Sequence, residues 1–271
     1  VPAGDIGAFG NMSDNWPNYS LPRCSLRLLI GPARSGLTTR LISEVRPALT
    51  EPEPRKVLWL VPSHRAGERL REQLVDSGVR ATLSIWIGTF DSLASEVLAG
   101  SGLPFRPIGG ELRWELLHLI VRKLAAQGEL QYFRPIASTS GLTDRLYHWI
   151  SRCQRVGVDP DRIRQTLDGE PSPRISEFLK IFSEYQETCR TNRWYDAQRR
   201  LWEADRLLRE GAVNLSLPTE IVVLDGFLEL LPAELAILQT LARHVREVLA
   251  TLLMDPKRPD LFSKTSRTRD R

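Results

Sequence analysis

The nonapeptide GPARSGLTT, which begins at Gly31, combines glycines and hydroxyl side chains at the spacing of a phosphate-binding loop. In that loop, G-x-x-x-x-G-K-[ST], backbone N–H groups surround the phosphates, the lysine reaches their oxygens and the hydroxyl ligates Mg²⁺. Gly31, Gly36 and Thr38 match the pattern and Thr39 follows, but Leu37 occupies the lysine position. We therefore predict an ATP/Mg site that Leu37 weakens; a strand–helix turn that merely needs flexible glycines is the alternative.

Asp225 is the second candidate, because it ends the apolar run IVVLD. In phosphate-loop NTPases an aspartate at the end of such a strand holds Mg²⁺. We predict Thr38 and Asp225 as the Mg²⁺ ligands, with Asp225 acting through water. The acid that usually follows this aspartate and orients the attacking water is missing, since Gly226 takes its position. An aspartate that only caps the end of a strand is the alternative.

Arg34 and Ser35 complete the predicted nucleotide-binding residues. Hydrogen bonds to charged groups contribute about 1.5–3 kcal/mol each, so loss of the lysine should weaken triphosphate binding by about tenfold or more. Arg34 carries a positive charge within the loop, but it projects from a different point than the missing lysine. Because both the lysine and the water-orienting acid are missing, we expect no working ATPase and assign no catalytic residue.

The scaffold around these residues is predicted to be α/β. Strand-like apolar runs alternate with helical patterns in the first half and near the end of the chain, which predicts parallel βαβ units. The strand-like runs are 25–30, 55–62, 81–90, 218–227 and 246–255. Ser63 and Asp91 are placed to cap the helices that follow the second and third runs.

A helical segment interrupts this α/β pattern. Between Glu111 and Gly211 no run is convincing as a strand, and Gly and Pro residues separate the helical patterns. Those patterns are near 111–127, 139–156, 159–168, 173–192 and 195–210. The predicted organisation is a disordered lead-in (1–22), an α/β domain (23–104 and 212–256), a helical insertion subdomain (105–211) and a disordered basic tail (257–271).

The order of the motifs resembles a known family. The strings WLVPSHRAGERLREQL and GTFDSLASEVL look like the single-strand DNA-contacting motifs of superfamily-one helicases. Together with the helical insertion and RWYDAQRRLWEADRLL before IVVLDGF, they resemble the N-terminal region of the B subunit of AddAB-type helicase–nucleases. The resemblance covers about 25–256 and rests on the order of the motifs more than on any single string.

This resemblance implies a RecA-like, P-loop NTPase-type domain that binds single-stranded or duplex-end DNA and pairs with a motor subunit, the A subunit, in double-strand-break repair. It places Ser63, His64, Thr89 and Phe90 at the DNA. A hydroxyl or N–H at a helix start can contact the DNA backbone, and Phe90 can stack on a base. The alternatives are a helix cap for Ser63, a surface histidine for His64 and a core residue for Phe90.

In the family, a second RecA-like domain and a nuclease domain with an iron–sulfur cluster follow. We assign no nuclease motif and no cluster ligands in this chain, because Cys24, Cys153 and Cys189 lie far apart. Isolated cysteines fit a reducing cytoplasm better than a disulfide framework. No apolar run approaches the roughly 18–20 residues of a membrane span, and the N-terminal stretch has no signal-peptide pattern.

Composition leaves the function open. The net charge of +4 permits a nucleic-acid partner without requiring one. Two other functions fit parts of the sequence. An active small P-loop NTPase fits the glycine loop and Asp225 but conflicts with Leu37 and Gly226, and a pure protein-interaction module with an inactive RecA-like fold fits both losses.

Overall fold

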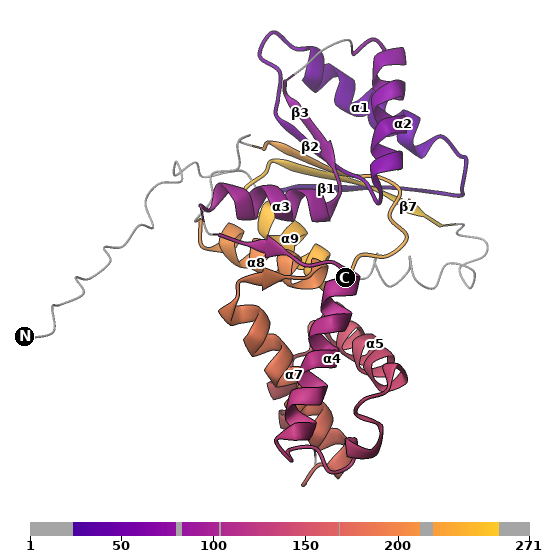
Figure 1. Cartoon of the computed structure of the whole chain (residues 1–271). Coiled ribbons are helices and arrows are strands. Elements are labelled where there is room, and N and C mark those ends of the chain that lie inside the picture. Colours follow the sequence, from indigo (N-terminus) through magenta and orange to yellow (C-terminus); the bar gives the residue numbers. More distant parts are fainter. Residues whose placement is uncertain (1–23, 80–82, 103, 168, 212–218, 255–271) are drawn as a thin grey trace, which may run out of the picture.

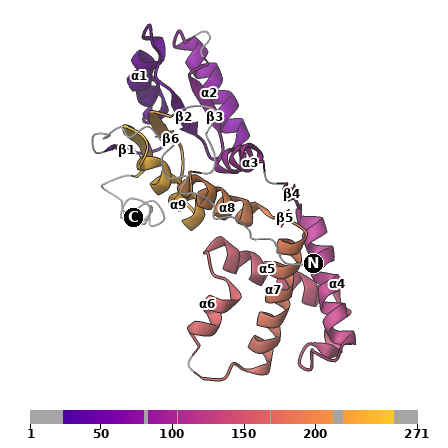
Figure 2. The same ribbon diagram turned by 90° about the vertical axis from the view of Figure 1, so that its left-hand side faces the viewer.

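The computed structural model describes residues 24–79, 83–102, 104–167, 169–211 and 219–254 (Figure 1). The predicted lead-in (1–22) and basic tail (257–271) lie outside the described residues. The described chain is elongated, with a sheet and its helices at one end and a group of further helices at the other (Figures 1 and 2). Among the described residues, no helix combines the length and the apolar character needed to cross a membrane.

Five strands form one parallel sheet in the order β1-β7-β6-β2-β3. They are β1 (Ser25–Gly31), β2 (Val57–Leu60), β3 (Ile85–Gly88), β6 (Ile221–Leu224) and β7 (Glu247–Leu253). Each predicted strand-like run overlaps one of them, and β1 extends one residue beyond its run, so the α/β class is confirmed. Strands β2 and β6 are buried along their whole length, as is typical of central parallel strands that are covered on both faces.

Helices cover both faces of the sheet. Helices α1 (Leu37–Thr50) and α2 (His64–Asp76) pack on one face, around the fully buried Trp59. Helices α3 (Phe90–Gly100), α8 (Ala197–Arg209) and α9 (Pro232–Ala242) pack on the other face, around Leu60, Val222 and Leu224. Each central strand therefore contributes alternate residues to two separate apolar cores, which holds its carboxyl end in a fixed place.

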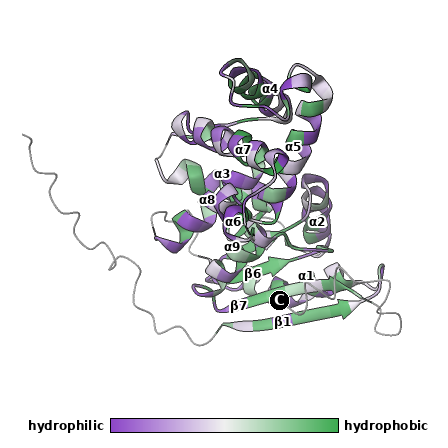
Figure 3. Ribbon diagram, turned by 90° about the horizontal axis from the view of Figure 1, so that it is seen from below, coloured by the Kyte–Doolittle hydropathy of each residue, from purple (hydrophilic) through white to green (hydrophobic). Residues whose placement is uncertain are grey.

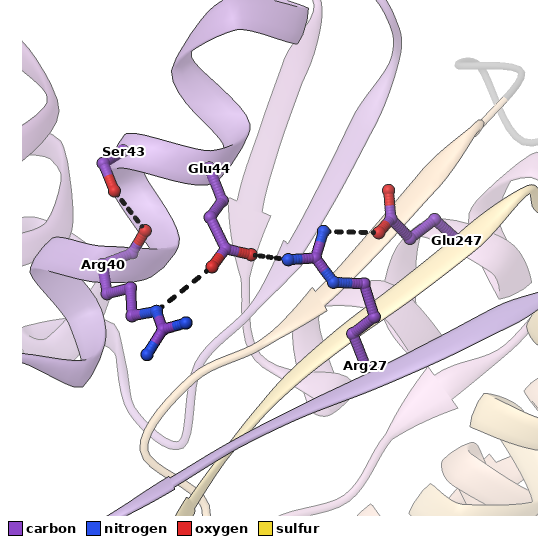
Figure 4. Close-up of polar contacts among 5 residues, drawn as sticks. All are labelled: Arg27, Arg40, Ser43, Glu44 and Glu247. Atoms are coloured by element: carbon purple, nitrogen blue, oxygen red, sulfur yellow. Dashed lines mark hydrogen bonds and ion pairs between the residues drawn. The ribbon is translucent and has the colours of Figure 1, made fainter.

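Arg27 of β1 links this strand to its neighbours (Figure 4). Its guanidinium lies 2.7 Å from Glu44 of α1 and 3.2 Å from Glu247 of β7. Glu44 also pairs with Arg40 at 3.3 Å, and Ser43 Oγ donates to the Arg40 carbonyl at 2.7 Å. These pairs are exposed, so each contributes well under about 1 kcal/mol. These ion pairs orient β1 and α1 relative to each other, on either side of the loop that joins the two elements.

The remaining helices form a third apolar core, at the end of the molecule away from the sheet (Figures 1 and 2). They are α4 (Gly110–Ala126), the 3₁₀ turn η1 (Arg134–Ile136), α5 (Ser140–Arg155), α6 (Pro160–Gln165) and α7 (Pro173–Thr191). Tyr185 and Phe182 of α7 are fully buried in this core. All the helices expected in this region are present, each within a few residues of its predicted bounds.

Two short strands lie where none was predicted. Strand β5 (Trp194–Tyr195) pairs in parallel with β4 (Arg106–Pro107), so the expectation of no strand between Glu111 and Gly211 is wrong. A strand of two residues has no alternation for a sequence pattern to detect. The ladder joins the two ends of the helical segment where it leaves and re-enters the sheet region.

Helix α8 packs with the sheet. Its Leu201, Ala204 and Leu208 belong to the apolar core shared with α3 and α9, and its Arg200 pairs with Asp91 of α3 at 2.7 Å. The sequence placed residues 197–209 within the helical segment, since their pattern is purely helical. The proposed domain boundaries remain a prediction. Helix α8 also contacts α5 and β5, so it connects the two ends of the molecule.

Candidate functional site

The segment between β1 and α1 is a tight loop with two residues in the left-handed conformation. Ser35 N–H donates to the Pro32 carbonyl at 3.3 Å, which closes a turn. Arg34 has φ of 64° and Gly36 has φ of 78°. A glycine adopts this conformation freely, whereas an arginine is strained in it. The side chain of Arg34 is exposed at the tip of the turn.

Gly31 lies in close contact with two side chains of this loop. A Cβ placed on residue 31 would lie 2.7 Å from Ser35 Oγ and 3.4 Å from Leu37 Cδ2. Leu37 therefore lies back over Gly31, and it also packs against the apolar core beneath α1. The leucine at the lysine position is thus partly a packing residue, in addition to lacking the charge that would reach a phosphate.

The first turn of α1 is open to an anion. Gly36 is the N-cap of α1, no side chain caps the helix, and its first turn has no acidic residue. The first N–H groups of a helix have no acceptor within the helix, and they carry a partial positive charge. A phosphate is the ligand that such a loop and helix start suit best.

Thr38 and Asp225 meet at this helix start, although they come from opposite ends of the chain. Thr251 Oγ1 of β7 donates to Asp225 Oδ1 at 2.9 Å, and Thr38 lies close enough for its hydroxyl to lower the pKa of the Asp225 carboxyl. Asp225 is 7% exposed. Burial raises the pKa of its carboxyl above the ordinary value, while the two hydroxyl donors oppose that rise.

Thr251 is a residue that the sequence analysis missed. Besides donating to Asp225, its Oγ1 accepts a hydrogen bond from Gly226 N–H at 2.9 Å. Thr251 thereby fixes both the carboxylate and the turn that follows β6. Its position in an otherwise apolar strand was the only signal available, and a buried strand threonine is too common to be informative.

Gly226 is itself constrained. It has φ of +81°, in the left-handed region, and a Cβ there would lie 3.8 Å from Pro62. In active phosphate-loop NTPases a catalytic acid occupies this position. In this chain the position is a glycine in a turn. Glu229, the next acid along the chain, is exposed, and no contact among the described residues brings it to Asp225.

The residues present fit a magnesium ion bound together with a phosphate. Mg²⁺ prefers oxygen ligands and is usually held by one or two protein groups, with waters and phosphate oxygens filling the other positions. The hydroxyl of Thr38 and the carboxylate of Asp225 are such a pair, and they lie near each other at the start of α1. The described residues contain no group of three or more His, Cys, Asp or Glu suited to a metal.

The four predicted DNA-contacting residues lie together in one pocket. The pocket has a volume of about 360 Å³ and opens beside Pro62, at the carboxyl ends of β2 and β3. Its lining includes Ser63, His64, Thr89 and Phe90, joined by Phe227 and Glu234 from the segment after β6. The sequence could place these residues at two strand ends; the strand order β6-β2-β3 makes the ends adjacent.

Two helices begin at this pocket. Ser63 Oγ accepts from Ala66 N–H at 3.2 Å and caps α2, as predicted. Thr89 Oγ1 accepts from Ser92 N–H at 3.1 Å and caps α3. The expectation that Asp91 is that cap is wrong, because α3 begins two residues earlier than the sequence indicated. Both caps leave the first two N–H groups of their helix available to an anion.

Several other groups in the pocket already have partners. Phe90 is 2% exposed and packs edge-on against Phe227, with 5.5 Å between ring centroids, so its proposed stacking on a base stays a prediction. Asp91 is paired with Arg200. Glu234 accepts from Leu231 N–H at 2.8 Å, and burial raises the pKa of its carboxyl. His64 is exposed at the first position of α2.

The fold and the candidate site first define the class of protein. This is an α/β protein with a parallel sheet, and its candidate residues all lie at the carboxyl edge of that sheet, where ligands of such sheets bind. The family then follows from comparison with known proteins. The model of the family described as "ADDB, N-terminal" matches residues 28–271, and the chain belongs to this family.

Curated relatives are named as the B subunit of an ATP-dependent helicase/deoxyribonuclease. The protein of Geobacillus thermodenitrificans is 26% identical over an alignment of 270 positions, which covers 90% of this chain and 22% of the relative. The protein of Geobacillus kaustophilus is 27% identical over an alignment of 250 positions, which covers 85% of this chain and 20% of the relative. The chain thus spans about a fifth of the length of the curated relatives it matches.

Proposed function

We propose that this chain is the N-terminal region of a helicase–nuclease subunit that acts on DNA ends, in which a degenerate phosphate loop holds Mg-nucleotide weakly and without turnover. The names of the relatives support the helicase–nuclease setting. The glycine loop and the carboxylate at the end of β6 support the nucleotide site. The pocket at the ends of β2 and β3 supports a separate DNA contact.

The observation that carries the nucleotide part is the proximity of Thr38 to Asp225, whose pKa the Thr38 hydroxyl lowers. Strand β7 lies between β1 and β6, so the loop must extend across a strand for the two groups to meet. A turn that only reversed the chain would need no such reach and no hydroxyl at that point. The pair of oxygens beside an open helix start is what Mg-phosphate binding requires.

We also propose that the sheet is a RecA-like domain interrupted by the helical segment. In support, the glycine loop follows the first strand, the candidate carboxylate ends another strand, and all five strands run parallel. Helices α4–α7 share a core of their own between α3 and β6. Both features agree with the order of motifs in the sequence.

Turnover is opposed by two independent features. Leu37 supplies no charge to the phosphates, and phosphoryl transfer depends almost entirely on positioning and electrostatic stabilisation. Gly226 supplies no acid, and its left-handed backbone disfavours any side chain there. An active small NTPase is the second function considered from the sequence. It would need other groups to replace both the lysine charge and the acid.

The pocket beside Pro62 is proposed as a contact for the backbone of single-stranded or duplex-end DNA. Two helix starts and two hydroxyls face it, and such groups contact phosphates without reading sequence. The motor partner, an A subunit, is proposed from the family resemblance. If the chain binds its motor partner but not DNA, a pure protein-interaction function replaces the DNA-binding part.

Calorimetric titration tests the proposal as a whole. The chain is titrated with Mg-ATP, with Mg-ADP and with ATP in excess chelator, and phosphate release is followed with and without single-stranded DNA. The expected result is weak saturable binding that needs Mg²⁺, with no phosphate release. DNA-stimulated release that disappears in Thr38→Ala would instead establish an active NTPase.

A further inference from the structure

A cavity of about 820 Å³ lies in the helical region. The loop between α5 and α6, the first turn of α6, the second half of α7 and the start of α8 form its walls. These helices carry many hydrophilic residues (Figure 3). The volume is within the range of known ligand sites, about 300–1,000 Å³. None of the residues assigned above to nucleotide or DNA lines this cavity.

The buried part of the lining is a polar network around Asp196, the N-cap of α8, which is 2% exposed. Its Oδ2 accepts hydrogen bonds from Tyr185 Oη at 2.9 Å and from Gln154 Nε2 at 2.8 Å. Its Oδ1 accepts from Arg199 N–H at 2.9 Å, and the guanidinium of Arg113 lies 3.7 Å from the same carboxylate. Both oxygens of this buried acid therefore have partners within the chain.

The other acids of the cavity also have partners. They are exposed residues of its lining: Asp159, Asp161 and Glu187. The first caps α6 by accepting a backbone N–H at 2.7 Å. The second pairs with Arg164 at 2.6 Å, and the third pairs with Arg190 at 2.7 Å. Groups of the chain itself therefore satisfy the negative charge of the cavity, whereas part of its positive charge is left without a partner.

That positive charge belongs to Arg162 and Arg199. Neither guanidinium takes part in an ion pair within the described part of the chain. Arg199 donates only to the Gln186 carbonyl, at 3.4 Å, and lies over the Tyr195 ring at 5.3 Å from its centroid. Arg162 is exposed on α6. Guanidinium groups bind carboxylates through strong, charge-assisted hydrogen bonds, so these two arginines favour a ligand with carboxylate groups.

Gln198 adds an acceptor without a donor. Its Oε1 atom is buried and accepts no hydrogen bond from any described residue, and the side chain lines the cavity. A buried acceptor of this kind costs stability unless a ligand supplies an N–H or O–H group. One turn later on α8, Trp202 gives the cavity an apolar wall. Its ring lies against Gly157, where a Cβ would come within 2.7 Å of Cζ2.

We propose that this cavity binds an acidic peptide segment of a protein partner. The carboxylates of the segment pair with Arg162 and Arg199. A backbone N–H of the segment donates to Gln198 Oε1, and an apolar side chain packs on Trp202. A peptide supplies these three groups within a few residues, whereas a nucleic-acid backbone has no N–H donor. The exposed carboxylates of the lining also repel a continuous polyanion more than a short segment with separated charges. Neither nucleotide nor DNA binding is required for this interaction.

Fluorescence anisotropy of a labelled peptide provides the test. The probe is a fluorescein-labelled hexapeptide in which glutamate and leucine alternate, and the control probe has glutamine in place of each glutamate. Both are titrated with wild type, Arg162→Gln, Gln198→Leu and Arg243→Gln, and the Tm of each protein is measured without peptide. Arg243 is the matched control, because it is exposed at the end of α9 and lies outside the cavity.

Wild type and Arg243→Gln should bind the acidic probe equally and saturably, and Arg162→Gln should bind it about tenfold more weakly. Gln198→Leu should also bind about tenfold more weakly, yet its Tm should rise by about 2 °C, because the unsatisfied acceptor is removed. A glutamine with a purely structural role would not combine a higher Tm with weaker binding.

No binding of the acidic probe to wild type, equal binding of the two probes, or unchanged affinity in either cavity variant would overturn the proposal. A lower Tm in Gln198→Leu would also overturn it, because the acceptor would then have a partner in the free protein. Displacement of the acidic probe by a single-stranded oligothymidine would overturn it in favour of a nucleic acid.

Discussion

The hydroxyl of Thr38, at the start of α1, lies beside the carboxylate of Asp225, directly after β6, and lowers the pKa of that carboxyl. This contact joins the two motifs that the sequence singled out for nucleotide binding. Thr251 holds the same carboxylate from β7 at 2.9 Å. The arrangement leaves two oxygen groups for the proposed magnesium site, while Leu37 and Gly226 occupy the positions of the lysine and the acid.

Leu37→Lys should increase Mg-ATP affinity by about tenfold, because one hydrogen bond to a charged phosphate is restored. The packing of Leu37 over Gly31 is lost, so a small drop in Tm is expected as well. Calorimetry measures the affinity, and Leu37→Gln, which is polar but uncharged, is the matched control. Equal affinity in both variants would mean that the loop does not hold phosphate.

Gly226→Glu should not create an ATPase, even combined with Leu37→Lys. A side chain at φ of +81° costs roughly 1–2 kcal/mol, so the variant should be less stable and its acid displaced. Gly226→Asn should lose less stability than Gly226→Ala, since asparagine enters the left-handed region more readily. Thermal unfolding and phosphate release measure the two effects. Turnover in the glutamate variant would show that the turn adapts.

Asp225→Asn should stabilise the chain at neutral pH, with a rise in Tm of about 2 °C. Burial raises the pKa of Asp225 above its ordinary value of 3.8, so between these two pKa values the unfolded chain binds fewer protons. The free energy of unfolding therefore falls as pH rises through that window. Asparagine can keep hydrogen bonds to both hydroxyls without this penalty.

The gain from Asp225→Asn should shrink as the pH is lowered toward 4, because the wild-type carboxyl then becomes neutral too. Mg-ATP affinity should fall in the same variant, since an amide is a poor magnesium ligand. A variant that is less stable than wild type at pH 7 would show that the carboxylate contributes to the fold itself.

Ser63→Asp should weaken single-stranded DNA binding by about tenfold while leaving stability unchanged. Aspartate caps a helix as well as serine, but its charge repels a phosphate at the start of α2. Thr139→Asp is the control, because Thr139 caps α5 in the helical region through Leu142 N–H. Fluorescence anisotropy across a salt series measures binding. Equal losses in both variants would indicate a general charge effect rather than a contact at the pocket.

The sequence predicted the strands and most helices because each has a strong periodic signal. Continuous apolar runs such as IVVL indicated the buried central strands, and Ser63 marked the start of α2. Prediction failed where the signal was short or ambiguous. The two-residue ladder of Trp194 and Tyr195 has no period, and either Thr89 or Asp91 has the chemistry to cap α3.

The sequence predicted individual residues of the site but not how they come together in space. Gly31, Thr38 and Asp225 follow from motif spacing, but the spacing says nothing of Thr251, which reaches Asp225 only because β7 lies between β1 and β6. The conformation of Gly226 was equally hidden. The residue looks like a lost acid in the sequence, whereas the structure shows a turn that requires a glycine-like backbone.

The most direct test of a retained but inactive nucleotide site is the Mg-ATP affinity of Thr38→Ala beside Thr38→Ser. Serine keeps the hydroxyl that faces Asp225, whereas alanine removes it. We predict measurable Mg²⁺-dependent binding in wild type and Thr38→Ser, an affinity about tenfold lower in Thr38→Ala, and no phosphate release in any of them. Equal affinities in all three proteins, or no binding in any, would contradict a retained site.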